Sequence, residues 1–111
     1  MARTTSKSST ITERPQREAI HPGEFLADEL RELNMSASGL ARVLRVPPNR
    51  VSQILAGKRA VSADTALRLG RYFGTGPALW LNLQQAYELD VAQKTTGRDL
   101  TNIPVRAAAA E

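Results

Sequence analysis

Residues 38–59, SGLARVLRVPPNRVSQILAGKR, decide the fold of this chain. The stretch predicts two short helices, the first over residues 38–44 and the second from Pro48 to just before Gly57. Apolar residues recur at helical spacing through both helices. They are Leu40, Ala41, Leu44, Val46, Val51, Ile54 and Leu55, and the polar residues left outside are Asn49, Arg50, Ser52 and Gln53. This pattern is typical of a helix-turn-helix, whose second helix presents its polar face to the DNA major groove.

The predicted turn between these helices carries an unusual residue and two prolines. Arg45 stands where a helix-turn-helix usually has glycine, and the left-handed conformation expected there costs a non-glycine residue on the order of 1 kcal/mol. Pro47 and Pro48 compensate. The residue before a proline is kept out of the helical region, and Pro48 fits the first turn of the next helix. We therefore expect a stiff turn.

The outward side chains of the second helix are those that DNA reading requires. Asn49 and Gln53 lie one turn apart, and their amides can pair with adenine, whereas Arg50 can pair with guanine or a phosphate. Ser52 can serve either a base or a phosphate. These four residues are the predicted base readers. The phosphate contacts expected on either side of them are Ser38, Arg45, Lys58 and Arg59.

Three further helices are expected around this motif, which makes the fold all-α with five helices. They are predicted over residues 23–33, from Ser62 and Asp64 to about residue 73, and from Pro77 to about residue 93. Ser36 or Ser38 is expected to cap the helix before the turn. The domain should span residues 21–94, between a flexible basic arm at 1–20 and a weakly structured tail at 95–111.

The last predicted helix is apolar around more of its circumference than a small domain can cover. Trp80 is expected to pack inward. The apolar surface that remains predicts a homodimer contact, through which two copies would read a palindrome. The residues expected there are Leu79, Leu83, Ala86, Leu89 and Asp90.

Composition limits the functions open to a chain of 111 residues. The absence of cysteine excludes disulfides and thiolate sites, and a single histidine excludes the common zinc spacings, so no metal or cofactor is expected. His21 is expected to be structural or solvated. An enzyme is not expected, since the chain has neither a phosphate loop nor a nucleophile elbow. No apolar run approaches the roughly 20 residues needed to cross a bilayer, so a soluble, cytoplasmic protein is expected.

Charge is distributed unevenly along the chain. The whole chain carries a net charge of +4, yet residues 38–71 hold seven arginines and lysines against the single acid Asp64, a net of +6. Such segregation over a helix-turn-helix pattern favours a phosphate-binding surface and double-stranded DNA as a partner.

Two segments, HPGEFLADEL (21–30) and RVSQILAGKRAVSADTALRLGRYFGTGPALWLNLQQAYEL (50–89), resemble the HigA-type antitoxins of bacterial toxin–antitoxin modules. That family lies within the Xre/Cro class, which implies a lambda-repressor-like fold. The resemblance further implies a cognate RelE/HigB-type toxin, which cleaves mRNA, as a partner, and a homodimer that binds operator DNA and represses its own operon. It places Asn49, Arg50, Ser52 and Gln53 on the recognition helix. A stand-alone Xre-family repressor is the alternative, because no residue intrinsically encodes toxin binding.

Overall fold

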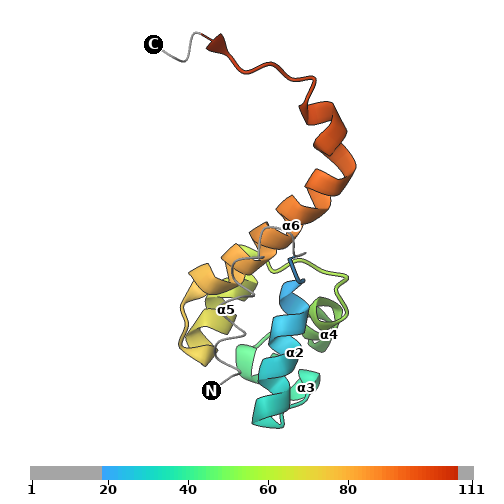
Figure 1. Ribbon diagram of the computed structural model, residues 1–111. Helices are drawn as coiled ribbons and strands as arrows, with labels where there is room; N and C mark the ends of the chain where they lie inside the picture. Colours follow the sequence, from blue (N-terminus) through green and yellow to red (C-terminus); the bar gives the residue numbers. More distant parts are fainter. Residues whose placement is uncertain (1–18, 108–111) are drawn as a thin grey trace, which may run out of the picture.

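The computed structural model describes residues 19–107 and shows five α-helices with no strand over that range (Figure 1). The helices are α2 (Pro22–Leu33), α3 (Ala37–Leu44), α4 (Pro48–Leu55), α5 (Ala63–Phe73) and α6 (Pro77–Leu100). The predicted all-α, five-helix class is therefore confirmed. Nearly all of the basic arm predicted at residues 1–20, and residues 108–111 of the predicted tail, lie outside the described part of the chain.

Three of the helices begin at a side-chain cap. His21 caps α2, Ser36 caps α3 by accepting from the Gly39 amide at 3.0 Å, and Ser62 caps α5 by accepting from the Thr65 amide at 3.3 Å. Each cap satisfies one of the amide groups that the first helical turn leaves without a partner. Of the two serines predicted to cap α3, the structure uses Ser36.

The turn between α3 and α4 has the strained conformation that the sequence predicts. Arg45 is left-handed, with φ 64° and ψ 46°, and the Val46 amide donates back to the Ala41 carbonyl at 3.0 Å. Pro47 is extended and Pro48 begins α4. The two prolines thus fix the direction in which the second helix leaves the turn.

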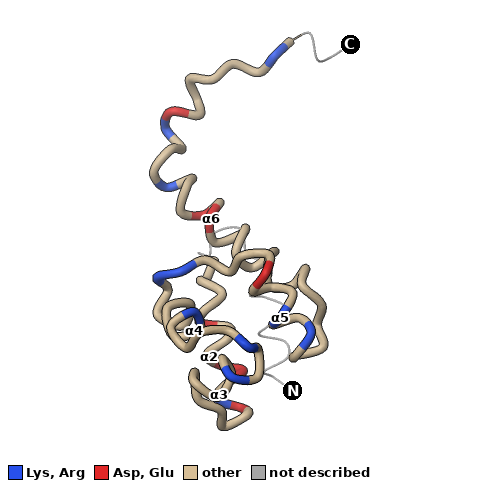
Figure 2. The backbone as a smooth tube through the Cα atoms, turned by 180° about the vertical axis from the view of Figure 1, so that it is seen from behind, with Lys and Arg blue, Asp and Glu red and all other residues tan. Residues whose placement is uncertain are grey.

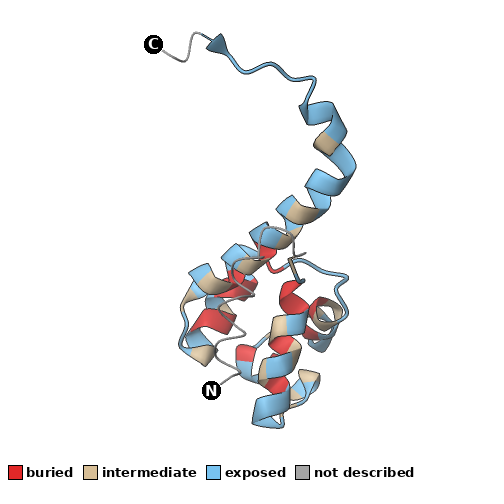
Figure 3. Cartoon of the chain, in the orientation of Figure 1, coloured by how far each residue is buried: buried red, intermediate tan, exposed pale blue. Residues whose placement is uncertain are grey.

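The core lies where α2 to α5 and the beginning of α6 meet (Figure 3). Its buried apolar residues are Leu26, Leu30, Leu40, Ala41, Leu44, Val51, Ile54, Val61, Ala66, Leu69 and Trp80. The indole of Trp80 packs edge-to-face on Phe25 and donates to the Thr75 hydroxyl at 3.1 Å. Trp80 therefore packs inward, as predicted.

Two glycines allow helices to approach closely in this core. A Cβ atom at Gly23 would overlap the backbone carbonyl of Ile54 in α4, and one at Gly70 would overlap the backbone of Gly76 and Pro77 at the start of α6. Each contact brings one helix directly against the main chain of another. These approaches place α4 against α2 and α6 against α5.

Helix α6 corrects the prediction for the C-terminal part of the chain. It does not end near residue 93 but continues to Leu100, so residues 95–100 of the predicted tail are helical. The only breaker in this part of the helix is Gly97, which disfavours helix by about 1 kcal/mol relative to Ala and does not end a helix that has already formed. The helix ends before Pro104, and its second half projects away from the other helices (Figure 1).

Over residues 19–107, no helix combines the length and the apolar character that a transmembrane segment requires.

Candidate nucleic-acid interface

The outer face of α4 presents three of the four predicted base readers. Asn49 and Ser52 are exposed and Gln53 is half-buried, while Val51 and Ile54 on the other face are buried in the core. No hydrogen bond of the Asn49 or Gln53 side-chain amide occurs within the described residues. Both amides are therefore available to pair with an external donor and acceptor, such as the edge of a base.

Arg50, the fourth predicted base reader, is held by α5. Its Nη1 donates to the Asp64 carboxylate at 2.5 Å and lies 3.4 Å from the Thr65 hydroxyl, and its side chain is only 28% exposed. The structure thus separates Arg50 from the three other predicted readers, since its guanidinium already has a charged partner.

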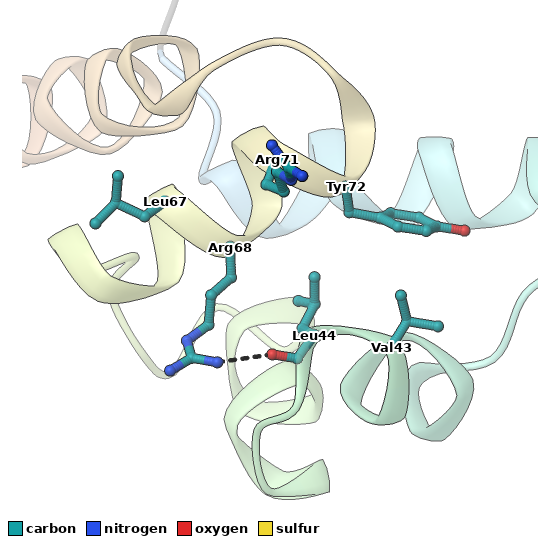
Figure 4. Close-up of a pocket in the computed structure, with 6 residues that line it drawn as sticks. All are labelled: Val43, Leu44, Leu67, Arg68, Arg71 and Tyr72. Carbon is teal, nitrogen blue, oxygen red and sulfur yellow. Dashed lines mark hydrogen bonds between the residues drawn. The ribbon is translucent and has the colours of Figure 1, made fainter.

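Arg68 joins the same carboxylate to the turn. Its Nε donates to Asp64 at 3.0 Å and its Nη1 donates to the Leu44 carbonyl at 2.9 Å, a bond visible in Figure 4. That carbonyl lies at the end of α3, where backbone acceptors lack partners within the helix. The side chains of Arg50, Asp64 and Arg68, which we call the arginine–aspartate bridge, therefore connect α3, α4 and α5.

Hydrogen bonds from Arg68 and then from Arg50 lower the pKa of Asp64 below its ordinary value. Asp64 is consequently a carboxylate at neutral pH. It lies in the first turn of α5, where a negative charge also complements the helix dipole.

The predicted phosphate contacts are exposed. Arg45, Lys58 and Arg59 make no side-chain ion pair within the described residues, and Ser38 lies in the exposed first turn of α3. Figure 2 shows basic residues gathered around α3, α4 and α5. Cations that are exposed and unpaired can meet a phosphate without breaking an ion pair within the chain, so these residues suit that role better than Arg50 and Arg68.

Two buried polar side chains hold the loop that carries Lys58 and Arg59. The Gln84 amide oxygen accepts from the Val61 backbone amide at 2.8 Å, while its Nε2 donates to Glu88 at 2.8 Å. On the other side, the ring of His21 makes a backbone hydrogen bond with Arg59 in the loop. The same ring accepts from the Gly23 amide of α2 through Nδ1 at 2.8 Å and meets Tyr87 edge-on. This loop between α4 and α5 is therefore fixed against both α2 and α6.

Burial lowers the pKa of His21, and the nearby charge of Glu24 and a backbone hydrogen bond with Arg59 oppose the shift. Near neutral pH the ring is therefore uncharged, as its acceptor bond from Gly23 requires. His21 has the structural role that the sequence suggested. The sequence does not predict the role of Gln84, because nothing in its sequence neighbourhood distinguishes it from the exposed Gln85.

The predicted dimer residues on α6 are not equivalent in the structure. Leu79 and Leu83 are half-buried and pack against the core of their own chain. Ala86 and Leu89 are exposed, Leu89 by 61%, and Asp90 pairs with Lys94 at 3.3 Å. Ala86 and Leu89 are thus the members of the set with most surface left for a partner.

No cluster of metal-ligating side chains is present in residues 19–107. The geometry offers instead a polar helix face bordered by exposed cations, which is the arrangement that duplex DNA requires.

Comparison with known proteins gives consistent matches. A sequence model of the helix-turn-helix family matches residues 26–80. Virulence-associated protein I of Dichelobacter nodosus is 49% identical over 77 residues, which cover 68% of this chain and 71% of that protein. Among solved structures, an addiction module antidote protein of a HigA family from Coxiella burnetii is 49% identical with a TM-score of 0.78, covering 81% of this chain and 99% of that one. The Pseudomonas aeruginosa antitoxin HigA, solved with the higBA promoter, is 42% identical with a TM-score of 0.77 over 81% and 99% of the two chains.

Proposed function

The chain belongs to the HigA-type antitoxins of the Xre helix-turn-helix class, and from that premise we propose that it acts as a homodimer on palindromic operator DNA. By binding there it represses its own operon. It also neutralises a cognate toxin of the RelE/HigB type. The observation that supports DNA binding is the outer face of α4. Asn49 is exposed there and Gln53 is half-buried, and their side-chain amides make no hydrogen bond among the described residues. The place of action is the bacterial cytoplasm.

In this proposal the residues divide into two groups. Asn49, Ser52 and Gln53 read base edges directly, together with Arg50. Ser38, Arg45, Lys58 and Arg59 contact phosphates and set the register of α4 in the groove. The P. aeruginosa HigA structure, solved with promoter DNA, supports DNA binding by this fold, because that chain has the same fold over nearly its whole length.

A homodimer fits the proposal because a single recognition helix reads only a few base pairs, and a dyad doubles the site. The contact is expected on α6 around Ala86 and Leu89, beside Leu79, Leu83 and Asp90. Leu89→Glu should therefore convert a dimer to monomers in light scattering, with the equally exposed Leu67→Glu on α5 as the matched control. An unchanged mass for Leu89→Glu would place the interface elsewhere.

DNA reading is tested by comparing Gln53→Ala with Lys58→Ala on an operator duplex and on a scrambled duplex of equal length. Loss of Gln53 should cost about 1–3 kcal/mol on the operator alone. Loss of Lys58 should weaken binding to both duplexes and reduce the salt slope by roughly one unit. Equal losses on both duplexes for Gln53→Ala would contradict base reading.

Toxin neutralisation rests on family membership, and its test is therefore separate. The chain is co-expressed with the product of the adjacent gene and separated by size-exclusion chromatography, with and without operator DNA. A stable complex and rescue of growth from that gene product are expected. If the neighbouring product neither binds nor inhibits growth, the chain is a stand-alone repressor.

A further inference from the structure

The arginine–aspartate bridge places an acidic side chain beside the recognition helix. Asp64 lies in the first turn of α5, and its side chain is 54% exposed. It is also the only acidic residue among residues 38–71, a segment with seven basic residues. A lone carboxylate here repels the phosphates of any bound duplex, so its presence needs another physical reason.

The reason lies in how Asp64 holds Arg50. The carboxylate and the Thr65 hydroxyl both approach Nη1 of Arg50, at 2.5 and 3.4 Å, and Thr65 itself is buried. The N–H groups on Nε and Nη2 make no hydrogen bond within the described residues. A guanidinium fixed at one nitrogen keeps a planar edge of donors in a set direction, which lowers the conformational entropy lost when it meets a base.

Asp64 is in turn fixed by a second arginine. Arg68 donates to the same carboxylate oxygen at 3.0 Å and to the Leu44 carbonyl at the end of α3 at 2.9 Å. The direction of the Arg50 side chain is thus fixed relative to both α3 and α5, the helices that precede and follow α4 in the chain. A surface ion pair alone would leave Arg50 free to swing, whereas this connected set restrains it.

We propose that Asp64 is a positioning residue for operator recognition, which aims Arg50 at a base edge and at the same time opposes binding to DNA that offers Arg50 no partner. The inference rests on the proposed DNA-binding function. It assigns to one carboxylate two effects of opposite sign, a gain on the correct sequence and a repulsion of the phosphates of every duplex. The aimed contact of Arg50 offsets this repulsion on the correct sequence alone, so that the two effects together favour that sequence.

The test replaces Asp64 by Asn, which keeps the shape of the side chain and removes its charge. Binding is measured to a duplex from the promoter region of the chain's own operon and to a scrambled duplex of the same length and composition. Affinity for the promoter duplex should fall about tenfold, within the range for one lost base contact, while affinity for the scrambled duplex should stay the same or rise. A residue that only stabilises the fold would lower both affinities together.

Asp28→Asn is the matched control, since Asp28 is also an exposed aspartate that pairs with an arginine, Arg31 in α2. It changes the net charge equally and should leave the ratio of the two affinities unchanged. Arg50→Lys keeps the charge but loses the planar donors, and it should reduce the ratio as much as Asp64→Asn. The double variant Arg50→Ala with Asp64→Asn should have the same ratio of the two affinities as Arg50→Ala alone.

Parallel losses on both duplexes, or an unchanged ratio for Asp64→Asn, would overturn the positioning role. Circular dichroism shows whether each variant is folded, and a fold lost in Asp64→Asn would also overturn the role by making the residue structural. Failure of the proposed function is distinguishable, because the unmodified protein would then fail to prefer its own promoter duplex.

Discussion

The two halves of α6 form one continuous helix but differ in what stabilises them. Trp80 and Gln84 in the first half are buried, and Leu79 and Leu83 pack against the core. In residues 89–100 no side chain is buried, and the helix projects from the domain (Figures 1 and 3). The first half therefore depends on tertiary contacts, whereas the second depends on local hydrogen bonds that extend a helix already formed.

This difference bears on function. The first half fixes the loop of Lys58 and Arg59 through Gln84, and so it shapes the face that we propose for DNA. The exposed side chains of Ala86 and Leu89 leave surface for the homodimer contact that we propose. One helix thus links the stability of the domain to the homodimer contact that we propose.

If the two halves of α6 differ in this way, the largest loss of stability is expected at Trp80. Trp80→Ala removes the largest fully buried side chain and its hydrogen bond to Thr75, and it should lower the free energy of unfolding by about 3–5 kcal/mol. Chemical denaturation followed by circular dichroism measures the loss. Leu100→Ala, an apolar truncation in the exposed half, should change stability by less than about 0.5 kcal/mol. Similar losses for the two variants would break the distinction between the halves.

A smaller effect is expected at Gln84. Gln84→Ala leaves the buried Val61 amide without its acceptor, which should cost about 1–3 kcal/mol. Amide hydrogen exchange at Val61 should accelerate. Gln85→Ala is the control, since Gln85 is an exposed neighbour with the same side chain. Unchanged exchange at Val61 in Gln84→Ala would mean that Gln84 does not hold the loop.

These two positions also show how far sequence predicts this molecule. The helices and their ends follow from local signals, such as Ser62 before α5 and Pro48 at the start of α4. Trp80 was predicted inside because its helix repeats apolar residues at helical spacing. By contrast, Gln84 meets Val61 only after α6 has packed, so no local pattern distinguishes it from Gln85.

The proposed interface shows the same limit. Exposure of Asn49 and Ser52 follows from helical periodicity alone, and the structure agrees with it. Arg50 and Asp64 are 14 residues apart and meet through tertiary packing, so the sequence predicts Arg50 as a base reader and does not predict its pairing with Asp64. The spacing of Asp64 and Arg68 at i and i+4 was the one local signal of the bridge. The DNA contacts of the predicted base readers and phosphate contacts stay predictions.

A pH dependence of stability is expected from His21, whose ring contacts the ring of Tyr87 in the first half of α6. Burial lowers the pKa of His21 below the ordinary 6.5, so the unfolded chain binds the proton more readily than the folded one. The stabilisation that the uncharged His21 ring gives the folded state is present above pH 6.5 and is lost as the pH falls towards the lowered pKa. His21→Asn keeps an N-cap acceptor without titrating, and its melting temperature should fall less between pH 7.5 and 5. Equal falls in both proteins would exclude His21 as the source.

The smallest effect is expected at Gly97, in the exposed half. A Cβ atom there would meet nothing within 4 Å, so Gly97→Ala should favour the local helix by up to about 1 kcal/mol. Helical circular dichroism should increase while the midpoint of global unfolding stays constant, because residues 89–100 bury no side chain in the core. The same change at Gly70 should instead destabilise the domain, since its Cβ would overlap the backbone that begins α6. If Gly97→Ala raised the midpoint of global unfolding, the projecting half would belong to the cooperative unit, and the two halves of α6 would differ in exposure but not in stability.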